Sequence, residues 1–170
     1  LRAMQRIGFA VDALDGEARY LLGTIGVKHR DSELAFNLWN GLPTPPNLNA
    51  IEWELTLARI ALQAGDAAAS VATMKRLLEG RTSVSPQLAQ RGLEVGQEML
   101  DMRRTHEART VYDLLVPLST DAHARQALFG LGRAYELEGE PHAASAHYLR
   151  TAPLVQATAP DELAFQARLL

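Results

Sequence analysis

One spacing recurs four times along the chain and constrains its fold more than any other feature. In each copy, two small residues lie twelve positions apart, and a large residue follows the second one after four more. Successive copies begin 35, 38 and 36 residues apart. The small pairs are Gly23/Ala35, Ala58/Ser70, Gly96/Ala108 and Gly132/Ala144. A fixed interval inside each copy and a variable one between copies predicts a repeated helix pair joined by connectors of different length.

The fourth copy is the most complete. Its positions are Leu128, Leu131-Gly132, Tyr135, Gly139, Ala144 and Tyr148. This pattern resembles the tetratricopeptide repeat family, which has a large apolar residue, Leu-Gly and Tyr in one helix and Ala-x3-aromatic in the next, with a period of about 34 residues. The resemblance covers residues 16–153. It implies an all-α fold, a right-handed superhelical solenoid of antiparallel helix pairs.

Close packing explains why these residue types recur. Two helices approach closely only where small side chains meet, and the large residue four positions after the second small one is expected to fill the space toward the next pair. We therefore expect Gly132 to lie against Ala144, with Tyr148 as the wedge. The first two copies depart from the pattern, since Arg19 and Glu54 replace the usual large apolar residue and Gly26 replaces the usual Tyr. We expect those pairs to tilt differently or to pack less tightly.

Capping residues and prolines predict where the helices begin. Ser85-Pro86, Asp121 and Pro160-Asp161 can open first helices, whereas Asp66, Thr105 and Glu140-Pro141 can open second helices. Residues 42–48 and 79–86 are predicted connectors. The expected helices lie near 2–14, 16–29, 32–40, 48–64, 66–79, 86–102, 105–117, 121–138, 140–152 and 160–170.

These helices group into four repeats and two partial ones. Residues 1–15 are the expected second helix of a preceding repeat, and residues 157–170 the first helix of a following repeat or a cap. The repeats between them span 16–47, 48–85, 86–120 and 121–156. Because the chain begins at Leu1 and ends at Leu170 within a helical pattern, we interpret both ends as cut from a longer protein.

The resemblance also implies a binding surface, because the first helices of such repeats line the concave side of the solenoid. The residues expected on it are Tyr20, Thr24, Lys28, Leu55, Arg59, Leu62, Leu93, Gln97, Leu100, Phe129, Arg133 and Leu137. Tyr20, Leu55, Leu93 and Phe129 occupy equivalent positions and could form an apolar stripe for an extended peptide or an amphipathic helix. The alternative is that these four side chains belong to the core.

The chemistry of this surface narrows the partner. Some co-chaperones of the family hold acidic C-terminal tails with a Lys/Asn/Arg clamp, and that clamp is missing here. Arg59, Gln97 and Arg133 share one position in the repeat. Acidic residues lie near it in the sequence, namely Glu52, Glu94 and Glu136. The surface is therefore expected to carry mixed charge, which disfavours a carboxylate tail.

Composition removes several other classes of partner. Seventeen basic residues stand against twenty acidic ones without a long basic run, so we expect neither nucleic acid nor an anionic membrane as partner. No stretch approaches the ~20 apolar residues of a membrane span. The absence of cysteine excludes disulfides and thiolate chemistry in this chain, and it fits bacterial cytoplasm and periplasm equally.

Catalytic patterns and cofactor motifs are missing from the sequence. The spacing of His142 and His147 differs from that of a metalloprotease helix, and no cysteine or carboxylate pair accompanies them. Glycine-rich phosphate loops and nucleophile elbows are also absent. We therefore expect no enzyme, metal or cofactor, and predict a scaffold that binds a protein or peptide partner. The resemblance implies a bacterial envelope or secretion assembly as its setting. The alternative is a structural spacer or self-association module without such a ligand.

Overall fold

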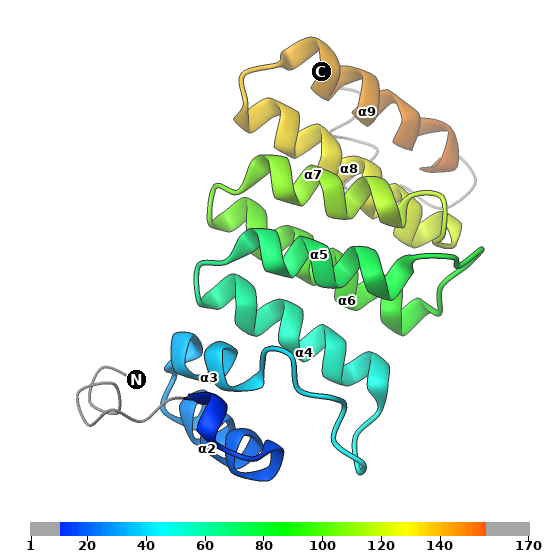
Figure 1. Cartoon of the computed structure of the whole chain (residues 1–170). Helices are drawn as coiled ribbons and strands as arrows, with labels where there is room; N and C mark the ends of the chain where they lie inside the picture. Colours follow the sequence, from blue (N-terminus) through cyan, green and yellow to red (C-terminus); the bar gives the residue numbers. More distant parts are fainter. Residues whose placement is uncertain (1–10, 156–170) are drawn as a thin grey trace. The chain divides into compact units, whose positions relative to one another are not determined.

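The computed structural model describes residues 11–155, and all regular structure in this part of the chain is helical (Figure 1). A short 3-10 helix, η1 (Val11–Ala13), precedes the α-helices. The α-helices are α2 (Gly16–Lys28), α3 (Ser32–Trp39), α4 (Ala50–Gln63), α5 (Ala67–Leu78), α6 (Pro86–Asp101), α7 (Thr105–Leu115), α8 (Asp121–Leu137) and α9 (Pro141–Val155). The all-α prediction is therefore confirmed for the described residues.

These eight helices match the predicted ones to within three residues at each end. Of the helix expected near 2–14, only the end is described, and there the chain forms the η1 turn instead of an α-helix. The helix expected at 160–170 lies outside the described residues.

Helix starts explain much of this agreement. Ser85 and Asp66 cap α6 and α5 as expected, because their side chains accept hydrogen bonds from the backbone N–H of Leu88 at 3.2 Å and of Ala69 at 2.9 Å. The expected caps Thr105 and Asp121 are instead the first residues of their helices. Neither α7 nor α8 has a side-chain cap at its preceding residue.

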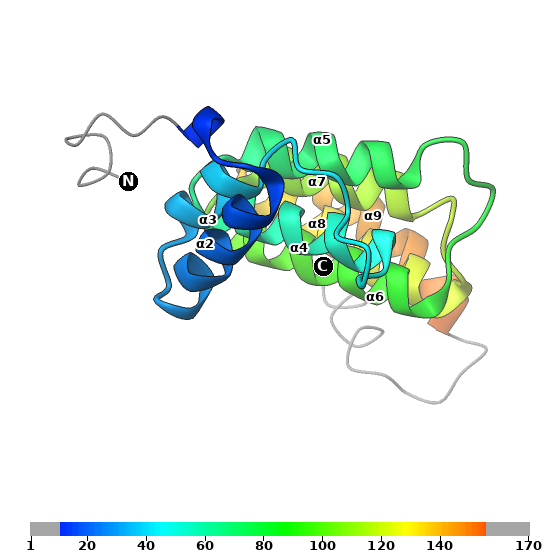
Figure 2. The same cartoon turned by 60° about the horizontal axis from the view of Figure 1, so that its bottom comes forward.

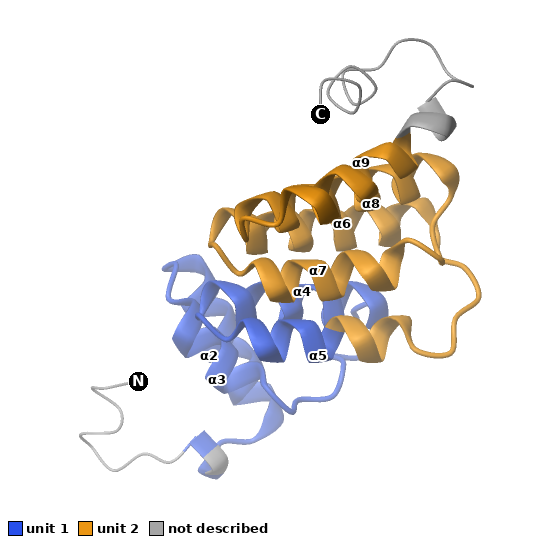
Figure 3. Ribbon diagram, turned by 90° about the horizontal axis from the view of Figure 1, so that it is seen from above, with its two compact units in different colours: residues 1–73 blue, residues 74–170 orange. Residues whose placement is uncertain are grey.

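The chain divides into two compact units, residues 1–73 and 74–170 (Figure 3). The first contains α2, α3, α4 and the beginning of α5. The second contains the end of α5 and α6 to α9. The boundary falls inside α5.

An aromatic cluster forms the core of the first unit, where α3 packs against both α2 and α4. Trp39 lies 5.0 Å from Trp53 and 6.0 Å from Tyr20 between ring centroids. Its indole N–H donates a 3.0 Å hydrogen bond to the carbonyl of Tyr20. A Cβ added to Gly23 would fall 2.1 Å from that indole nitrogen, so the tryptophan occupies the space that this glycine leaves.

Both departures in the first repeat have structural causes. The Arg19 guanidinium donates hydrogen bonds to the carbonyls of Leu38 at 2.9 Å and Asn40 at 2.8 Å, and so satisfies free acceptors at the end of α3. Gly26 lets α3 approach, since a Cβ there would lie 3.1 Å from the backbone nitrogen of Ala35. An aromatic side chain at this position would have no room. The expectation of looser packing is therefore wrong around Gly26.

In the second unit, α6, α7 and α8 pack against one another and α9 packs on α8 (Figure 2). The Tyr112 ring of α7 lies between two glycines, one on each first helix. A Cβ added to Gly96 or Gly130 would come within 2.6 Å or 2.5 Å of that ring. Tyr148 of α9 covers Gly132 in the same way, since a Cβ added to this glycine would fall 2.4 Å from the Tyr148 ring. Tyr148, and not Ala144, thus supplies the nearest atoms to Gly132.

The same packing recurs at Gly23, Gly96 and Gly132, each covered by the aromatic residue sixteen positions later. In each of these three pairs the large residue covers the glycine of its own helix pair, whereas it was predicted to fill the space toward the next pair. Tyr112 also does the latter, at Gly130. Because all three contacts join a first helix to its own second helix, they fix each hairpin locally.

We predict that Gly132→Ala destabilises the protein although alanine favours helix formation. The new methyl group would overlap the Tyr148 ring, and overpacking of this kind costs about 1–3 kcal/mol, against a propensity gain of about 1 kcal/mol. Urea unfolding followed by circular dichroism measures the difference. Gly16→Ala is the matched control, because its new Cβ would lie 3.8 Å from Leu42 and should be neutral or stabilising. Equal unfolding midpoints for the two variants would contradict the packing described here.

Candidate functional site

The structure separates the predicted binding residues into buried and exposed sets. Leu55 and Leu62 of α4 and Leu93 and Leu100 of α6 are at most 7% exposed. These leucines lie in the core, as the alternative interpretation expected for Leu55 and Leu93. A partner could reach them only by displacing helices.

The remaining predicted residues differ in how accessible they are. Tyr20 is half-buried in the aromatic cluster of the first unit, and Phe129 is half-buried with its ring 5.2 Å from that of Tyr148. Arg59 is also half-buried, whereas the exposed members are Thr24, Lys28, Gln97, Arg133 and Leu137. The four apolar side chains of the expected stripe are therefore not all accessible to a partner. The chemistry that a partner would meet is that of the exposed residues.

In the second unit, the predicted binding residues that are exposed lie on two helices, α6 and α8. Gln97 and Asp101 of α6 are joined by a 2.8 Å hydrogen bond, from the Gln97 amide to the Asp101 carboxylate. Arg133 and Leu137 follow one turn apart on α8, which packs against α6. We call these four residues the α6–α8 face. It presents an amide, a carboxylate, a guanidinium and one apolar side chain that is 38% exposed.

One buried tyrosine, Tyr112, interacts electrostatically with both helices of this face. Burial raises the pKa of Tyr112, Arg133 of α8 lowers it and Asp101 of α6 raises it. Both charges therefore act on the same hydroxyl, which lies between the two helices. Burial also raises the pKa of Tyr148, whose hydroxyl donates a 3.0 Å hydrogen bond to Glu136. Tyr112 thus interacts electrostatically with charged groups of both helices of the face, and Tyr148 with Arg133 of α8.

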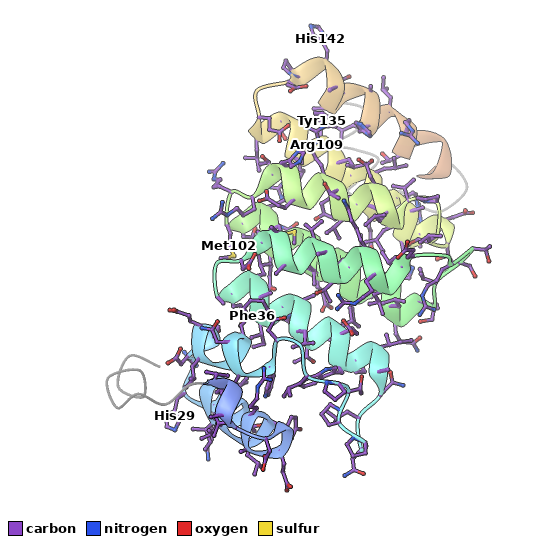
Figure 4. All side chains as sticks on the ribbon, in the orientation of Figure 1. His29, Phe36, Met102, Arg109, Tyr135 and His142 are labelled. Atoms are coloured by element: carbon purple, nitrogen blue, oxygen red, sulfur yellow. The ribbon has the colours of Figure 1, made fainter. Side chains whose placement is uncertain are left out.

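A second cluster joins α7, α8 and α9, and it was not predicted from the sequence. The Arg109 guanidinium lies 3.9 Å from the centroid of the Tyr135 ring, and Figure 4 shows these two side chains together. Arg109 also donates 2.7 Å hydrogen bonds to the Tyr135 hydroxyl and the Glu138 carboxylate. The His147 ring stacks near the Tyr135 ring with centroids 5.1 Å apart. One tyrosine thus contacts side chains from both neighbouring helices.

The charges in this cluster stabilise one another. Burial opposes ionisation of Glu138, but hydrogen bonds from Thr105 and Arg109 lower its pKa below the usual value. Burial also works against the Arg109 cation, yet the hydrogen bond to Glu138 raises its pKa. Burial lowers the pKa of His147, and nearby Arg150 lowers it further while Asp113 opposes this. The cluster therefore favours an ionised Arg–Glu pair beside a neutral histidine.

Geometry gives this cluster a structural role. Its ion pair is largely shielded from solvent, with the two side chains 27% and 20% exposed. Within residues 11–155, the buried Nε of Arg109 and Nδ1 of His147 have no hydrogen-bond partner. Only Tyr135 belonged to the repeat pattern, and nothing in the local sequence indicated that Arg109 would reach it.

The other histidines do not converge on a site. His142 points away from the helices at the start of α9 (Figure 4). Among the described residues, no group of three or more histidines and carboxylates is placed to hold a metal ion. The helices of this part of the chain are also too short or too polar to span a membrane.

No protein-family model and no curated protein matches this sequence. The resemblance to tetratricopeptide repeats therefore stays a prediction from the spacing of the residues. The functional interpretation depends on the α6–α8 face and on the packing of the helices that carry it.

We predict that Arg109→Ala lowers the free energy of unfolding by about 2 kcal/mol. The change removes charge-assisted hydrogen bonds from a shielded pair and the cation–π contact with Tyr135. The control is Arg91→Ala, which breaks a 3.2 Å pair with Glu94 whose side chains are 46% and 37% exposed. An exposed pair of this kind contributes about 0.5 kcal/mol or less. Chemical denaturation of both variants gives the comparison, and similar losses would contradict a bracing role for Arg109.

We also predict that stability falls with acidification through His147. Because the folded state lowers its pKa, this group's contribution is present above the unfolded value of about 6.5 and is lost as the pH falls toward the folded value. His147→Gln should flatten the pH dependence of the melting temperature in this window. His142→Gln changes an exposed imidazole of the same helix and serves as the control. If both variants keep the wild-type slope, His147 is not responsible.

Proposed function

We propose that this chain is a non-catalytic scaffold of tetratricopeptide type that binds a segment of another protein on the α6–α8 face. The observation that carries the proposal is the recurrent aromatic ring over a glycine at one spacing. Such packing supports a row of similar helix pairs, which is the architecture that the resemblance implies. A solenoid of this type exposes the first helices of successive repeats as one continuous surface, and α6 and α8 are such first helices.

The chemistry of the face supports a partner segment of mixed character. Arg133 can pair with a carboxylate, and Asp101 can accept from a cationic or amide side chain. Leu137 offers one exposed apolar contact beside them. A peptide with alternating acidic, polar and apolar side chains fits these groups better than a uniformly acidic tail does.

Rigidity beneath the face favours binding as well. Tyr112 is 2% exposed and Tyr148 is 3% exposed, and each ring fills the space left by a glycine of α6 or α8. Helices fixed in this way lose little conformational freedom when a partner docks, so ordering the protein reduces the binding free energy less. A bacterial envelope or secretion assembly is the setting that the resemblance implies.

A second candidate function is self-association, the alternative named from the sequence. It is supported by α2, which exposes Leu21, Ile25 and Val27 at 55%, 50% and 40%. This surface belongs to the first unit and shares no residue with the α6–α8 face. The two functions can therefore be tested separately.

We predict that the double substitution Arg133→Glu with Leu137→Ser weakens peptide binding at least tenfold without unfolding the protein. Both side chains are exposed, so the fold should tolerate the change. Peptides selected from a random displayed library against the wild-type chain provide the ligands, and calorimetric titration provides the affinities.

The control is Arg150→Glu with Leu149→Ser, which makes the same chemical changes at exposed positions of α9. We expect it to retain wild-type affinity. Equal weakening by both double variants, or by neither, would move the binding surface away from the α6–α8 face. Failure to select any peptide would favour the self-association alternative.

A further inference from the structure

The most apolar exposed surface in the described part of the chain lies on α2. Among the described residues, seven large hydrophobic side chains are exposed. Three of them, Leu21, Ile25 and Val27, belong to α2. Monomeric proteins scatter such residues singly, so a group on one helix indicates a contact surface. The packing partner of α2 within the first unit is α3, which covers the side that carries Gly23 and Gly26.

Four residues form the centre of the exposed side of α2. Glu17, Leu21, Thr24 and Lys28 are all exposed, and at about 100° per residue they fall within an arc of about 60°. Their spacing of four, three and four residues is that of a helix contact seam. Ile25 and Val27 lie on either side of this seam. We call these six residues the α2 face.

The charges on the α2 face are arranged for a second copy of the same helix. Glu17 lies in the first turn and Lys28 is the last residue of α2. When two copies run antiparallel, with the pairing centred between positions 22 and 23, each Glu17 lies opposite the Lys28 of the other copy. Leu21 then lies opposite Thr24. A parallel pairing would instead set Glu17 against Glu17 and Lys28 against Lys28.

Two further effects favour the antiparallel arrangement. The helix dipoles then point in opposite directions, so the positive end of each helix lies beside the negative end of the other. A two-fold contact also uses the same patch on both copies, and so it closes after two chains. Ile25 and Val27 would cover the edges of the seam and remove apolar surface from water.

From this complementarity we propose that the α2 face is a homodimer interface in which two copies of α2 pack antiparallel about a two-fold axis. The interface consists of one 13-residue helix from each copy, which is small for a stable complex. A contact of this size is expected to be reversible, with a dissociation constant on the order of 0.1 mM. The interface is independent of the proposed peptide binding on the α6–α8 face.

Sedimentation velocity on the full chain, from about 0.01 to 1 mM, tests the proposal around that expected dissociation constant. The wild type should pass from monomer to dimer over this range. Glu17→Lys and Lys28→Glu should each weaken the dimer at least tenfold, because each creates two like-charge pairs. Mixed in equal amounts, the two variants should form a heterodimer, because every lysine then faces a glutamate.

Matched controls separate this effect from changes in folding. Glu33→Lys makes the same charge reversal in the first turn of α3 and should leave the dimer unchanged. Leu21→Ser should weaken the dimer, whereas Leu48→Ser, at a position that is 43% exposed outside α2, should not. Circular dichroism and thermal melting should show that every variant remains folded.

Three outcomes would overturn the proposal. The first is a monomer throughout the concentration range, which would mean that something other than a second copy covers the α2 face. The second is a dimer that survives both charge reversals. The third is a mixture of the two charge variants that fails to associate while each remains folded. None of these outcomes bears on peptide binding, which the α8 variant tests separately.

Discussion

An aromatic ring lying on a glycine is the contact on which this structure depends. Glycine within a helix costs about 0.5–1 kcal/mol relative to alanine. A buried Tyr or Trp removes on the order of 150–250 Å² of its surface from water. This gain outweighs the cost of the glycine wherever the ring can reach the backbone. Gly23, Gly96 and Gly132 make it possible three times, and Gly130 lets Tyr112 contact two helices at once. The sixteen-residue spacing between glycine and ring in these three pairs follows from this contact.

That dependence explains why the helices could be predicted so closely from the sequence. Both the glycine spacing and the caps at Ser85 and Asp66 are local signals, since each involves residues of a single hairpin or turn. The binding residues were harder to predict, because exposure depends on neighbouring helices. On α6, Leu93 and Leu100 are buried while Glu94 and Asp101 are accessible, so the accessible side of the helix is rotated relative to the predicted one. Gln97 lies in both sets.

The Arg109 cluster shows a second limit of sequence reasoning. Arg109 and its partners Tyr135 and Glu138 are 26 and 29 residues apart, and they belong to different predicted repeats. The Tyr135 position is part of the repeat pattern, but its partner varies because equivalent positions carry different side chains. In the first repeat the same position is Gly26, where close backbone approach replaces the aromatic contact. The same position of the pattern thus carries a glycine that allows close helix approach in one repeat and a large aromatic ring in another.

The two proposed surfaces differ in how their charged groups are related to the buried core. On the α6–α8 face, Asp101 and Arg133 interact electrostatically with the buried Tyr112, so their arrangement is tied to the core and should discriminate among partners by geometry. On the α2 face, the charges lie at the two ends of one helix and the apolar side chains between them. Such a pattern specifies the orientation of a partner helix more than its sequence, which suits pairing with an identical copy. Each surface is built within one unit, so a substitution on one need not disturb the other.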